Sequence, residues 1–165
     1  MGTDSIRKYL RQTYEIAAQL SDDIHTKNGA LILSPTGSVI TIGANAFPSD
    51  VKLQPDRLVR PLKYEYLIHA ETNAILAAAR AGVSIRDCTM VAGWAACTRC
   101  AQNIIESGIT TLITHLATRY MTPARWQENI ALADNMMKEA GVKIILFDEE
   151  IGGVENLFNQ VVWKP

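Results

Sequence analysis

The sequence lacks a long apolar run. No segment approaches the roughly 18 to 20 uninterrupted apolar residues that a membrane-spanning helix needs. The first stretch, Met1 to Arg11, alternates charged with apolar residues and has no apolar core of the kind found in signal peptides. We therefore expect a cytoplasmic protein that has no membrane partner.

The sequence also has little net charge. Sixteen basic and 17 acidic residues give a formal charge of −1, and the two signs are mixed along the whole chain. Proteins that bind a polyanion usually carry a clustered basic surface. The charge pattern therefore favours a small-molecule substrate and argues against a nucleic-acid polymer as a partner.

Cysteine is scarce: the chain has three, an odd number. A disulfide framework is not expected in a cytoplasmic chain of this kind. Cys97 and Cys100 lie three residues apart, which calls for a metal or redox explanation. Cys88 has no such neighbour and is predicted to lie in the core.

Internal repeats and low-complexity segments are absent as well. The chain of 165 residues is long enough to bury a substantial core, and 48% of its residues are hydrophobic. We predict a single domain over residues 1–165. Its tail, residues 149–165, is expected to pack on the domain or on a neighbouring subunit.

Apolar periodicity predicts alternating helices and strands. Helices are expected over 4–20, 67–80, 98–106 and 123–140, with Thr122 as the N-cap of the last and Pro123 as its first residue. Strands are expected over 30–33, 39–44, 89–93, 111–116 and 142–147. Three prolines interrupt the apolar pattern between the second strand and the second helix, in a long connection over 47–67.

This order of elements predicts an α/β fold with three layers, α/β/α, around a five-stranded mixed sheet. The first two strands form a hairpin. A full helix connects the fourth strand to the fifth, so these two strands should be parallel and joined by a right-handed crossover.

Two short motifs carry the candidate chemistry. His69 and Glu71 lie near the start of one predicted helix, and Cys97 and Cys100 lie at the start of another. Imidazole and thiolate are ligands that zinc prefers, and three protein ligands leave the fourth tetrahedral position open. The sequence therefore predicts one catalytic Zn²⁺ per chain, held by His69, Cys97 and Cys100.

Glu71 is the predicted proton carrier. Because residues two apart do not share a helix face, Glu71 should not bind the metal beside His69. Zinc lowers the pKa of a bound water from about 15.7 to about 7, and a nearby carboxylate can then move protons during attack on an sp² carbon. A histidine, a glutamate two residues on and a later Cys-x-x-Cys pair are the pattern of zinc deaminases, in which the glutamate is not a ligand.

On these motifs the chain resembles the deoxycytidylate (dCMP) deaminase family, within the cytidine deaminase-like superfamily. The likeness covers about residues 5–148, the expected core. It includes the segments TKNGA (26–30), GANAFP (43–48), HAETNAI (69–75) and CTRCA (97–101). The resemblance implies hydrolysis of dCMP to dUMP and ammonia by a homo-oligomer, a dimer or larger.

The resemblance also implies substrate contacts. Asn45 is expected to contact the sugar or base. Further contacts are expected from Lys27, Ala70, Trp94 and Ala95. A 5′-phosphate would need cationic partners, and guanidinium groups suit phosphate oxygens. The candidates are Lys27, Arg57, Arg60, Lys63 and Arg119.

The chain departs from the family pattern in one wall of the expected base pocket. Ala96 stands where the family usually has proline, and Gly93 to Ala96 replace the usual wall segment. Trp94 can stack on the base or can be only a bulky strand residue. His25 and Asn28 replace the small or apolar residues common near the first strand.

Three alternatives stay open at this point. The first is a deaminase of another cytosine-type base, nucleoside or modified pyrimidine nucleotide. The second is a tRNA adenosine deaminase, against which the near-neutral charge argues. The third is a catalytically silent zinc-binding subunit, which would have no use for Glu71.

Overall fold

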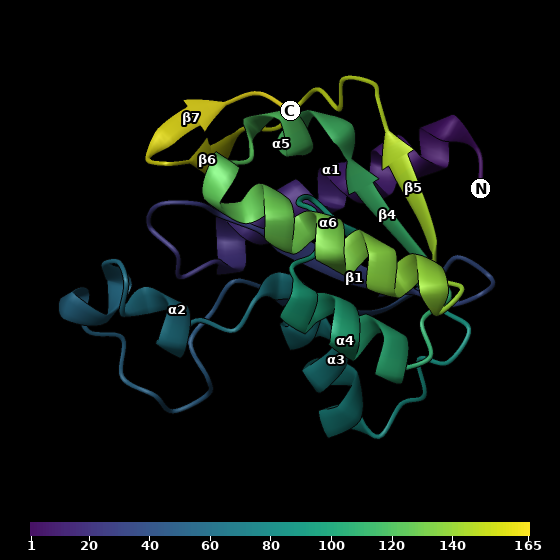
Figure 1. The fold of residues 1–165 in the computed structure, drawn as a ribbon, viewed down its shortest axis with the longest axis horizontal. Helices are drawn as coiled ribbons and strands as arrows, with labels where there is room; N and C mark the ends of the chain where they lie inside the picture. The colour runs from purple at the N-terminus through teal and green to yellow at the C-terminus, as the bar shows by residue number, and fades with distance from the viewer.

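Five strands form one mixed sheet in the computed structural model, which describes residues 1–165 (Figure 1). They are β1 (Gly29–Leu33), β2 (Val39–Ala44), β3 (Thr89–Ala92), β4 (Thr111–His115) and β5 (Lys143–Phe147). The strand order is β2-β1-β3-β4-β5. β1 is antiparallel to β2 and β3, whereas β3, β4 and β5 are parallel to one another. The predicted mixed sheet, with its last two strands parallel, is confirmed.

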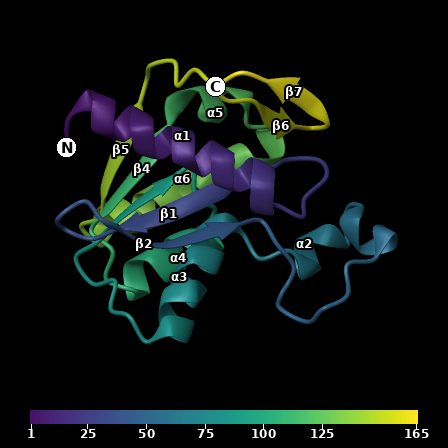
Figure 2. The same ribbon diagram turned by 180° about the vertical axis from the view of Figure 1, so that it is seen from behind.

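Helices cover both faces of the sheet. The helices are α1 (Thr3–Leu20), α2 (Lys63–Tyr66), α3 (Ala70–Ala81), α4 (Thr98–Glu106), α5 (Leu116–Met121) and α6 (Ala124–Glu139), of which α2 lies to the side of the sheet. Figure 1 shows α4 and α6 in front of the sheet, and Figure 2 shows α1 across the opposite face. None of these helices is both long enough and apolar enough to cross a bilayer. The predicted three-layer arrangement is therefore confirmed.

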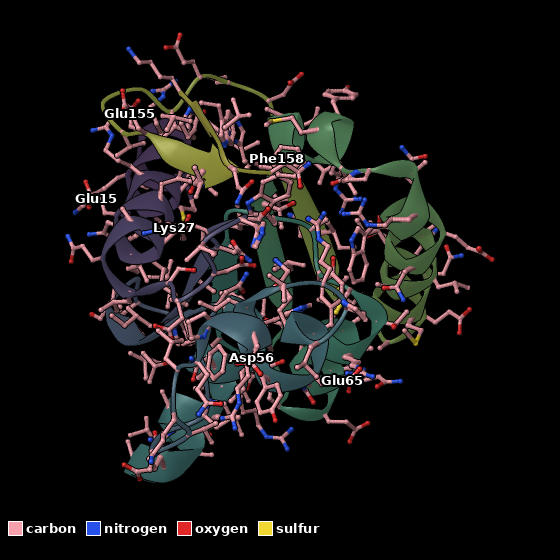
Figure 3. All side chains as sticks on the ribbon, turned by 90° about the vertical axis from the view of Figure 1, so that its left-hand side faces the viewer. Glu15, Lys27, Asp56, Glu65, Glu155 and Phe158 are labelled. Atoms are coloured by element: carbon pink, nitrogen blue, oxygen red, sulfur yellow. The ribbon has the colours of Figure 1, made fainter.

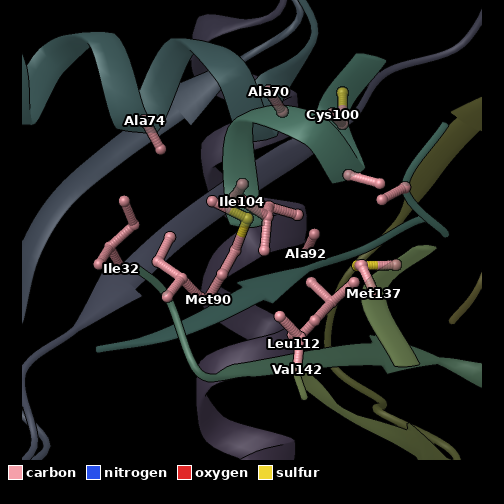
Figure 4. Packing of buried hydrophobic residues seen from close by; sticks show 14 of the residues in the cluster. Ile32, Ala70, Ala74, Met90, Ala92, Cys100, Ile104, Leu112, Met137 and Val142 are labelled. Atoms are coloured by element: carbon pink, nitrogen blue, oxygen red, sulfur yellow. The ribbon is translucent and has the colours of Figure 1, made fainter. Parts of the chain in front are cut away.

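A hydrophobic core lies on each side of the sheet. On the side of α3, α4 and α6, Met90 and Leu112 from the strands pack with Ile104 and Met137 from the helices (Figure 4). On the other side, Tyr14 of α1 packs in a second buried cluster. The apolar spacing along α1 places its buried residues on one face, as an amphipathic helix requires.

Two glycines let helices approach the sheet closely. A Cβ atom on Gly29 would lie 2.1 Å from the carbonyl oxygen of Thr13 in α1. A Cβ on Gly43 would lie 2.3 Å from the carbonyl oxygen of Ala70 and 2.4 Å from the nitrogen of Ala74. Because both contacts are with backbone, neither side chain could be accommodated without moving a helix. Gly43 thus fixes the start of α3 against β2.

Helix boundaries differ from the prediction at two places. α3 begins at Ala70 and not at residue 67, because Ile68 pairs with Ala46 in an isolated β-bridge and holds the chain extended. α6 has Pro123 as its N-cap, and Thr122 instead ends the short helix α5, which the sequence did not predict. In both places the chain before the helix is held in extended conformation.

The connection over 47–67 and the tail contain short elements that the sequence did not predict. A 3₁₀ helix, η1 (Pro55–Leu58), and α2 lie within the connection. In the tail, β6 (Asn156–Phe158) and β7 (Val161–Trp163) form a separate two-stranded antiparallel sheet. Figures 1 and 2 show this hairpin beside the end of α1 and near the start of α6.

Candidate metal centre and substrate cleft

The starts of α3 and α4 bring three metal-binding side chains together. His69 is the N-cap of α3 and Cys97 is the N-cap of α4. His69 Nδ1 lies 3.4 Å from Cys97 Sγ and 3.5 Å from Cys100 Sγ, and the two sulfur atoms are 3.6 Å apart. The partial positive charge of both helix N-termini favours thiolate at this point.

These distances fit a tetrahedral zinc ion. With Zn–S bonds of about 2.3 Å and a Zn–N bond of about 2.0 to 2.1 Å, tetrahedral angles place two sulfurs about 3.8 Å apart and a nitrogen about 3.6 Å from each sulfur. The observed separations of 3.6, 3.4 and 3.5 Å lie within about 0.2 Å of these values. No fourth histidine, cysteine or carboxylate joins the group. The donor set therefore fits zinc with one position left open.

A second set of hydrogen bonds holds the cysteines in place. Thr72 Oγ1 lies 3.7 Å from Cys100 Sγ and accepts a hydrogen bond from Asn103 Nδ2 at 2.9 Å. At the start of α4, the Thr98 backbone N–H donates to Asn129 Oδ1 of α6 at 2.9 Å. Partners of this kind orient metal ligands and limit their movement.

The two thiols differ in acidity. The hydrogen bond between the two thiols is the main cause that lowers the pKa of Cys97, and His69 lowers it further. The same hydrogen bond, together with burial, raises the pKa of Cys100. Burial alone would lower the pKa of His69, but its hydrogen bond with Cys97 and the charge of Glu71 raise it.

Glu71 lies in the first turn of α3, with 2% of its surface exposed. Burial raises the pKa of its carboxyl group to about 7, against the opposing charge of His69. Asn28 Nδ2 lies 3.5 Å from Glu71 Oε2 and donates to it, whereas the buried Oδ1 of Asn28 has no partner. A carboxyl group that titrates near neutral pH can both accept and donate a proton.

A cleft opens from these residues to the surface. His69, Glu71 and Cys97 line its base. Two aromatic pairs line its sides: Trp94 stacks on Phe158 with ring centroids 4.8 Å apart, and Tyr64 meets Trp126 edge-on at 5.8 Å. The remaining lining residues come from the 23–28 loop, the segments that follow β2 and β3 (Asn45 and Ala95), the 47–67 connection, the segment before α6 and its first half, and the tail hairpin. Such a cleft can enclose a flat, polar ring.

The predicted substrate contacts occupy different positions. Asn45, Trp94 and Ala95 line the cleft. Asn45 Oδ1 accepts a hydrogen bond from the Ala70 backbone N–H at 3.0 Å, and Ala70 itself is fully buried outside the lining. Lys27 lies away from the cleft, where its Nζ donates to the carbonyl of Ala18 at 2.9 Å (Figure 3). The structure thus does not bring Lys27 to the other candidates.

Two of the five predicted phosphate-binding cations are already in ion pairs. Lys63 Nζ lies 2.7 Å from Asp23 Oδ2 in a buried ion pair. Arg119 forms two hydrogen bonds with Asp134, at 2.6 and 3.0 Å. The guanidinium of Arg57 lies over the ring of Tyr66, outside the cleft lining. Of the predicted cations, only Arg60 lines the cleft without an ion pair.

The cleft also contains residues that were not among the predicted contacts, and three of them matter for the site. Arg125 is an exposed cation without an ion pair at the start of α6, next to Trp126. Phe158 and Asn159 come from the tail hairpin. The Arg-Trp sequence is a signal that could have pointed to Arg125. No local signal places the tail at the cleft, because its position depends on tertiary contacts.

Comparison with known proteins supports the same family as the motifs do. Residues 3–116 match the family described as the cytidine and deoxycytidylate deaminase zinc-binding region. The chain is 32% identical over 133 residues to a deaminase of Aliivibrio fischeri encoded in the luxG 3′ region, covering 81% of this chain and 87% of that one. It is 31% identical over 112 residues to the deoxycytidylate deaminase of Pongo abelii, covering 64% of this chain and 62% of that one.

Solved structures show the same fold. The dCMP deaminase of the cyanophage S-TIM5, in complex with dCMP and dUMP, aligns with a TM-score of 0.70 and 21% identity over 88% of this chain and 98% of that one. The predicted cytidine deaminase-like fold is therefore confirmed. Together with the zinc-binding family region, the group of His69, Cys97 and Cys100 identifies one zinc ion as the cofactor.

Proposed function

The chain belongs to the cytidine and deoxycytidylate deaminase zinc-binding family, and we propose from this premise that it hydrolyses dCMP to dUMP. In this reaction water replaces the exocyclic amine of the cytosine ring, and ammonia is released. The observation that carries the proposal is the position of Glu71, buried beside the metal-binding trio at the base of a cleft with two unpaired arginines.

His69, Cys97 and Cys100 hold the zinc ion in the proposed site. When bound, zinc acts as a Lewis acid that makes a water molecule nucleophilic at neutral pH. Cys100 must give up its proton before it can bind the metal, because the thiolate is the ligand. Thr72 and Asn103 then keep its sulfur in place.

Glu71 moves the protons. A carboxylate oxygen of Glu71 takes a proton from the attacking water and delivers it to N3 of the ring. It then carries the second water proton to the exocyclic nitrogen, which leaves as ammonia. The carboxyl group thus ends in the state in which it began. Its burial excludes bulk water from these transfers.

The walls of the cleft orient the nucleotide. We infer that the Asn45 side chain contacts the sugar or base, since Asn45 lines the cleft and its Oδ1 is held by the Ala70 backbone. Phe158 covers one face of the Trp94 indole, which leaves the other face or the ring edge for the base. Trp94 and Ala95 together form one side of the base pocket in this proposal.

Two arginines suit the 5′-phosphate. Arg60 and Arg125 line the cleft, are exposed, and form no ion pair. A guanidinium group can donate two parallel hydrogen bonds to phosphate oxygens. The opposite charges of Asp23 and Lys63 cancel each other, so this ion pair does not offset the positive charges of Arg60 and Arg125. A nucleotide is therefore favoured over the free base as the substrate.

Release of ammonia by the zinc-loaded protein tests the substrate. The panel is cytosine, deoxycytidine, CMP, dCMP, dCTP and adenosine. We expect the highest kcat/KM with dCMP. A preference for deoxycytidine or cytosine would contradict the phosphate assignment and support deamination of another cytosine-type compound, which the altered wall at Trp94 would accommodate. A preference for adenosine would reject the cytosine assignment.

Substitution Glu71→Gln tests the chemistry separately from binding. The amide cannot carry a proton between water and the ring, so kcat should fall by about 10²-fold or more, while zinc content stays at one ion per chain. Glu65→Gln, which removes an exposed carboxylate on α2, is the matched control and should retain full activity. Activity of Glu71→Gln within tenfold of the native protein would rule out the proton-carrying role.

The molecular setting is also proposed. We infer one domain over residues 1–165, a cytoplasmic location and a homo-oligomer, a dimer or larger. The family resemblance supports the oligomer, and the formal charge of −1 supports a small-molecule nucleotide over a nucleic-acid polymer as partner. Multi-angle light scattering at micromolar concentration tests the oligomer; a monomer mass of 18.2 kDa would contradict it.

A further inference from the structure

The tail hairpin lies beyond residues 3–116, the part of the chain that matches the family. Its turn consists of Asn159 and Gln160, both with positive φ, at 48° and 65°. Two-residue turns of this kind match the twist of the strands that they join, and asparagine is favoured in them. The turn therefore gives the hairpin a defined shape, with Phe158 and Asn159 at its tip.

Main-chain hydrogen bonds fix the hairpin against the 23–28 loop. The Lys27 N–H donates to the carbonyl of Leu157 at 3.0 Å, and the Gln160 N–H donates to the carbonyl of His25 at 2.9 Å. Asn156 Nδ2 donates to the carbonyl of Lys27 at 3.2 Å. These contacts come from β6 and the turn, on either side of the tip, so the tip is held in one place at the cleft.

The tip reaches two parts of the cleft. Phe158 stacks on Trp94 with an interplanar angle of 30°, and Figure 3 shows Phe158 where the hairpin faces the interior. Asn159 Oδ1 accepts a hydrogen bond from Arg60 Nη2 at 3.0 Å. Arg60 belongs to the 47–67 connection, and this is its only side-chain hydrogen bond in the structure. The tail therefore sets the position of the Arg60 guanidinium.

A guanidinium group has five N–H donors in a fixed plane. The bond to Asn159 uses one donor and orients the plane, which leaves others for a ligand in the cleft. Arg60 has no carboxylate partner, so its positive charge is not neutralised. An oriented, unpaired guanidinium at the side of a cleft suits an anion with several oxygens, such as a phosphate monoester.

We propose that the tail hairpin is a specificity element of the cleft, in which Asn159 is a positioning residue that holds Arg60 for the 5′-phosphate of the nucleotide. Phe158 has a separate role, because it holds the plane of Trp94 beside the base. The inference rests on the proposed deamination of dCMP. It adds residues outside the matched family region to the set that selects the substrate.

Kinetics with dCMP and deoxycytidine test the proposal, because these substrates differ only in the phosphate. The variants are Asn159→Gly, Arg60→Ala and the double variant; glycine is chosen because it tolerates the positive φ of residue 159. Asn159→Gly should raise the KM for dCMP by about three- to tenfold, as expected for loss of one charged hydrogen bond, and leave kcat unchanged. Its kcat/KM for deoxycytidine should stay within about twofold.

The double variant tests whether Asn159 acts through Arg60. If it does, the double variant should have the KM of Arg60→Ala within about twofold, since the two changes remove one interaction. Two controls match these changes: Gln160→Gly alters the same turn, and Lys164→Ala removes a cation from an exposed part of the tail. Neither should change the KM for dCMP.

Phe158→Leu provides an independent readout of the other half of the tip. It should raise KM for dCMP and deoxycytidine by the same factor, because both share the base. Effects of Asn159→Gly that are equal for both substrates, or effects of Asn159→Gly and Arg60→Ala that multiply, would overturn the positioning role. If the native protein deaminates dCMP and the Asn159→Gly variant has the same KM for dCMP, only this inference is overturned. Native protein inactive on dCMP would overturn the proposed function, and the inference with it.

Discussion

The ion pair between Asp23 and Lys63 shows how one residue pair can shape the cleft without touching the reaction. Both side chains are at least 95% buried, with contacts of 2.7 and 2.9 Å. Asp23 Oδ1 also accepts the backbone N–H groups of His25 and Thr26, at 2.8 and 3.3 Å. The carboxylate therefore organises the loop that carries Asn28 and contacts the tail hairpin.

Substitution Lys63→Met should destabilise the protein because it leaves the buried carboxylate of Asp23 without its counter-charge. Removing one partner of a buried pair costs about 3 to 5 kcal/mol of unfolding free energy. Urea denaturation of the zinc-loaded protein measures this, with Lys52→Met, at an exposed position, as the control. The double variant with Asp23→Asn keeps the acceptor for the backbone but removes the charge, so it should lose less. A double variant less stable than Lys63→Met would contradict this account.

At the residue scale, the metal-binding chemistry of single side chains was easier to predict than the residues that surround them in the fold. The zinc ion was predictable because ligand preference is a property of the side chain, and the spacing of Cys97 and Cys100 brings both to one helix start. The pairing of Lys63 was not, because Asp23 is distant in sequence and exposed lysine is the usual case. Phe158 and Asn159 likewise depend on where the tail folds.

At the scale of elements, close packing of α3 against β2 positions the helix that begins at His69 and carries Glu71. Gly43 has no room for a side chain beside the backbone of Ala70 and Ala74. Since His69 and Glu71 flank Ala70, any shift of this helix start moves a metal ligand and the proposed proton carrier together. Strand β2 thus fixes the position of the metal-binding helix start, although none of the residues of β2 lines the cleft.

Substitution Gly43→Ala should push α3 away from the sheet. The added methyl would meet backbone atoms at 2.3 and 2.4 Å, which flexible side chains cannot relieve. We expect a loss of about 3 kcal/mol of unfolding free energy, at the upper end for overpacking, together with less than one zinc per chain after dialysis. Gly2→Ala, which meets nothing within 4 Å, is the control. Full zinc content with unchanged stability would show that α3 is not held at Gly43.

The longer elements were predictable and the short ones were not. α1 follows apolar periodicity because it buries one face, and β1, β3 and β4 are apolar runs that lie almost wholly inside. α5 has six residues and follows β4 directly, so it offers too few positions for a period to be seen. The hairpin strands have three residues each, and are stabilised by contacts with the 23–28 loop.

Across the whole molecule, His115 joins three distant segments. It stands at the end of β4, and its Nδ1 lies 2.8 Å from the hydroxyl of Tyr14 in α1. Trp163 of β7 stacks on its ring, with centroids 6.2 Å apart. Burial lowers the pKa of His115, although a hydrogen bond with the Glu149 backbone and the charge of Asp148 oppose the shift.

Stability should therefore depend on the protonation of His115. Its pKa is lower in the folded state than the unfolded value of about 6.5, so below that pH the unfolded state binds a proton that the folded state does not. The contribution of neutral His115 to the free energy of unfolding is therefore fully present above about pH 6.5, and it is lost as the pH falls through the folded-state pKa of His115. In urea denaturation between pH 8 and 5.5, His115→Gln should show a shallower decline than the native protein. Parallel curves for the two proteins would exclude His115 as the source.

The parts of the site have different origins along the chain. The metal-binding trio and Glu71 lie between residues 69 and 100, whereas the walls also draw on the 23–28 loop and on residues 158 and 159 near the other end. Randomising the turn of the tail hairpin in a mutant library would therefore vary the surroundings of a bound compound and leave the metal-holding segment intact. Directed evolution toward new nucleotide analogues has a natural starting point there.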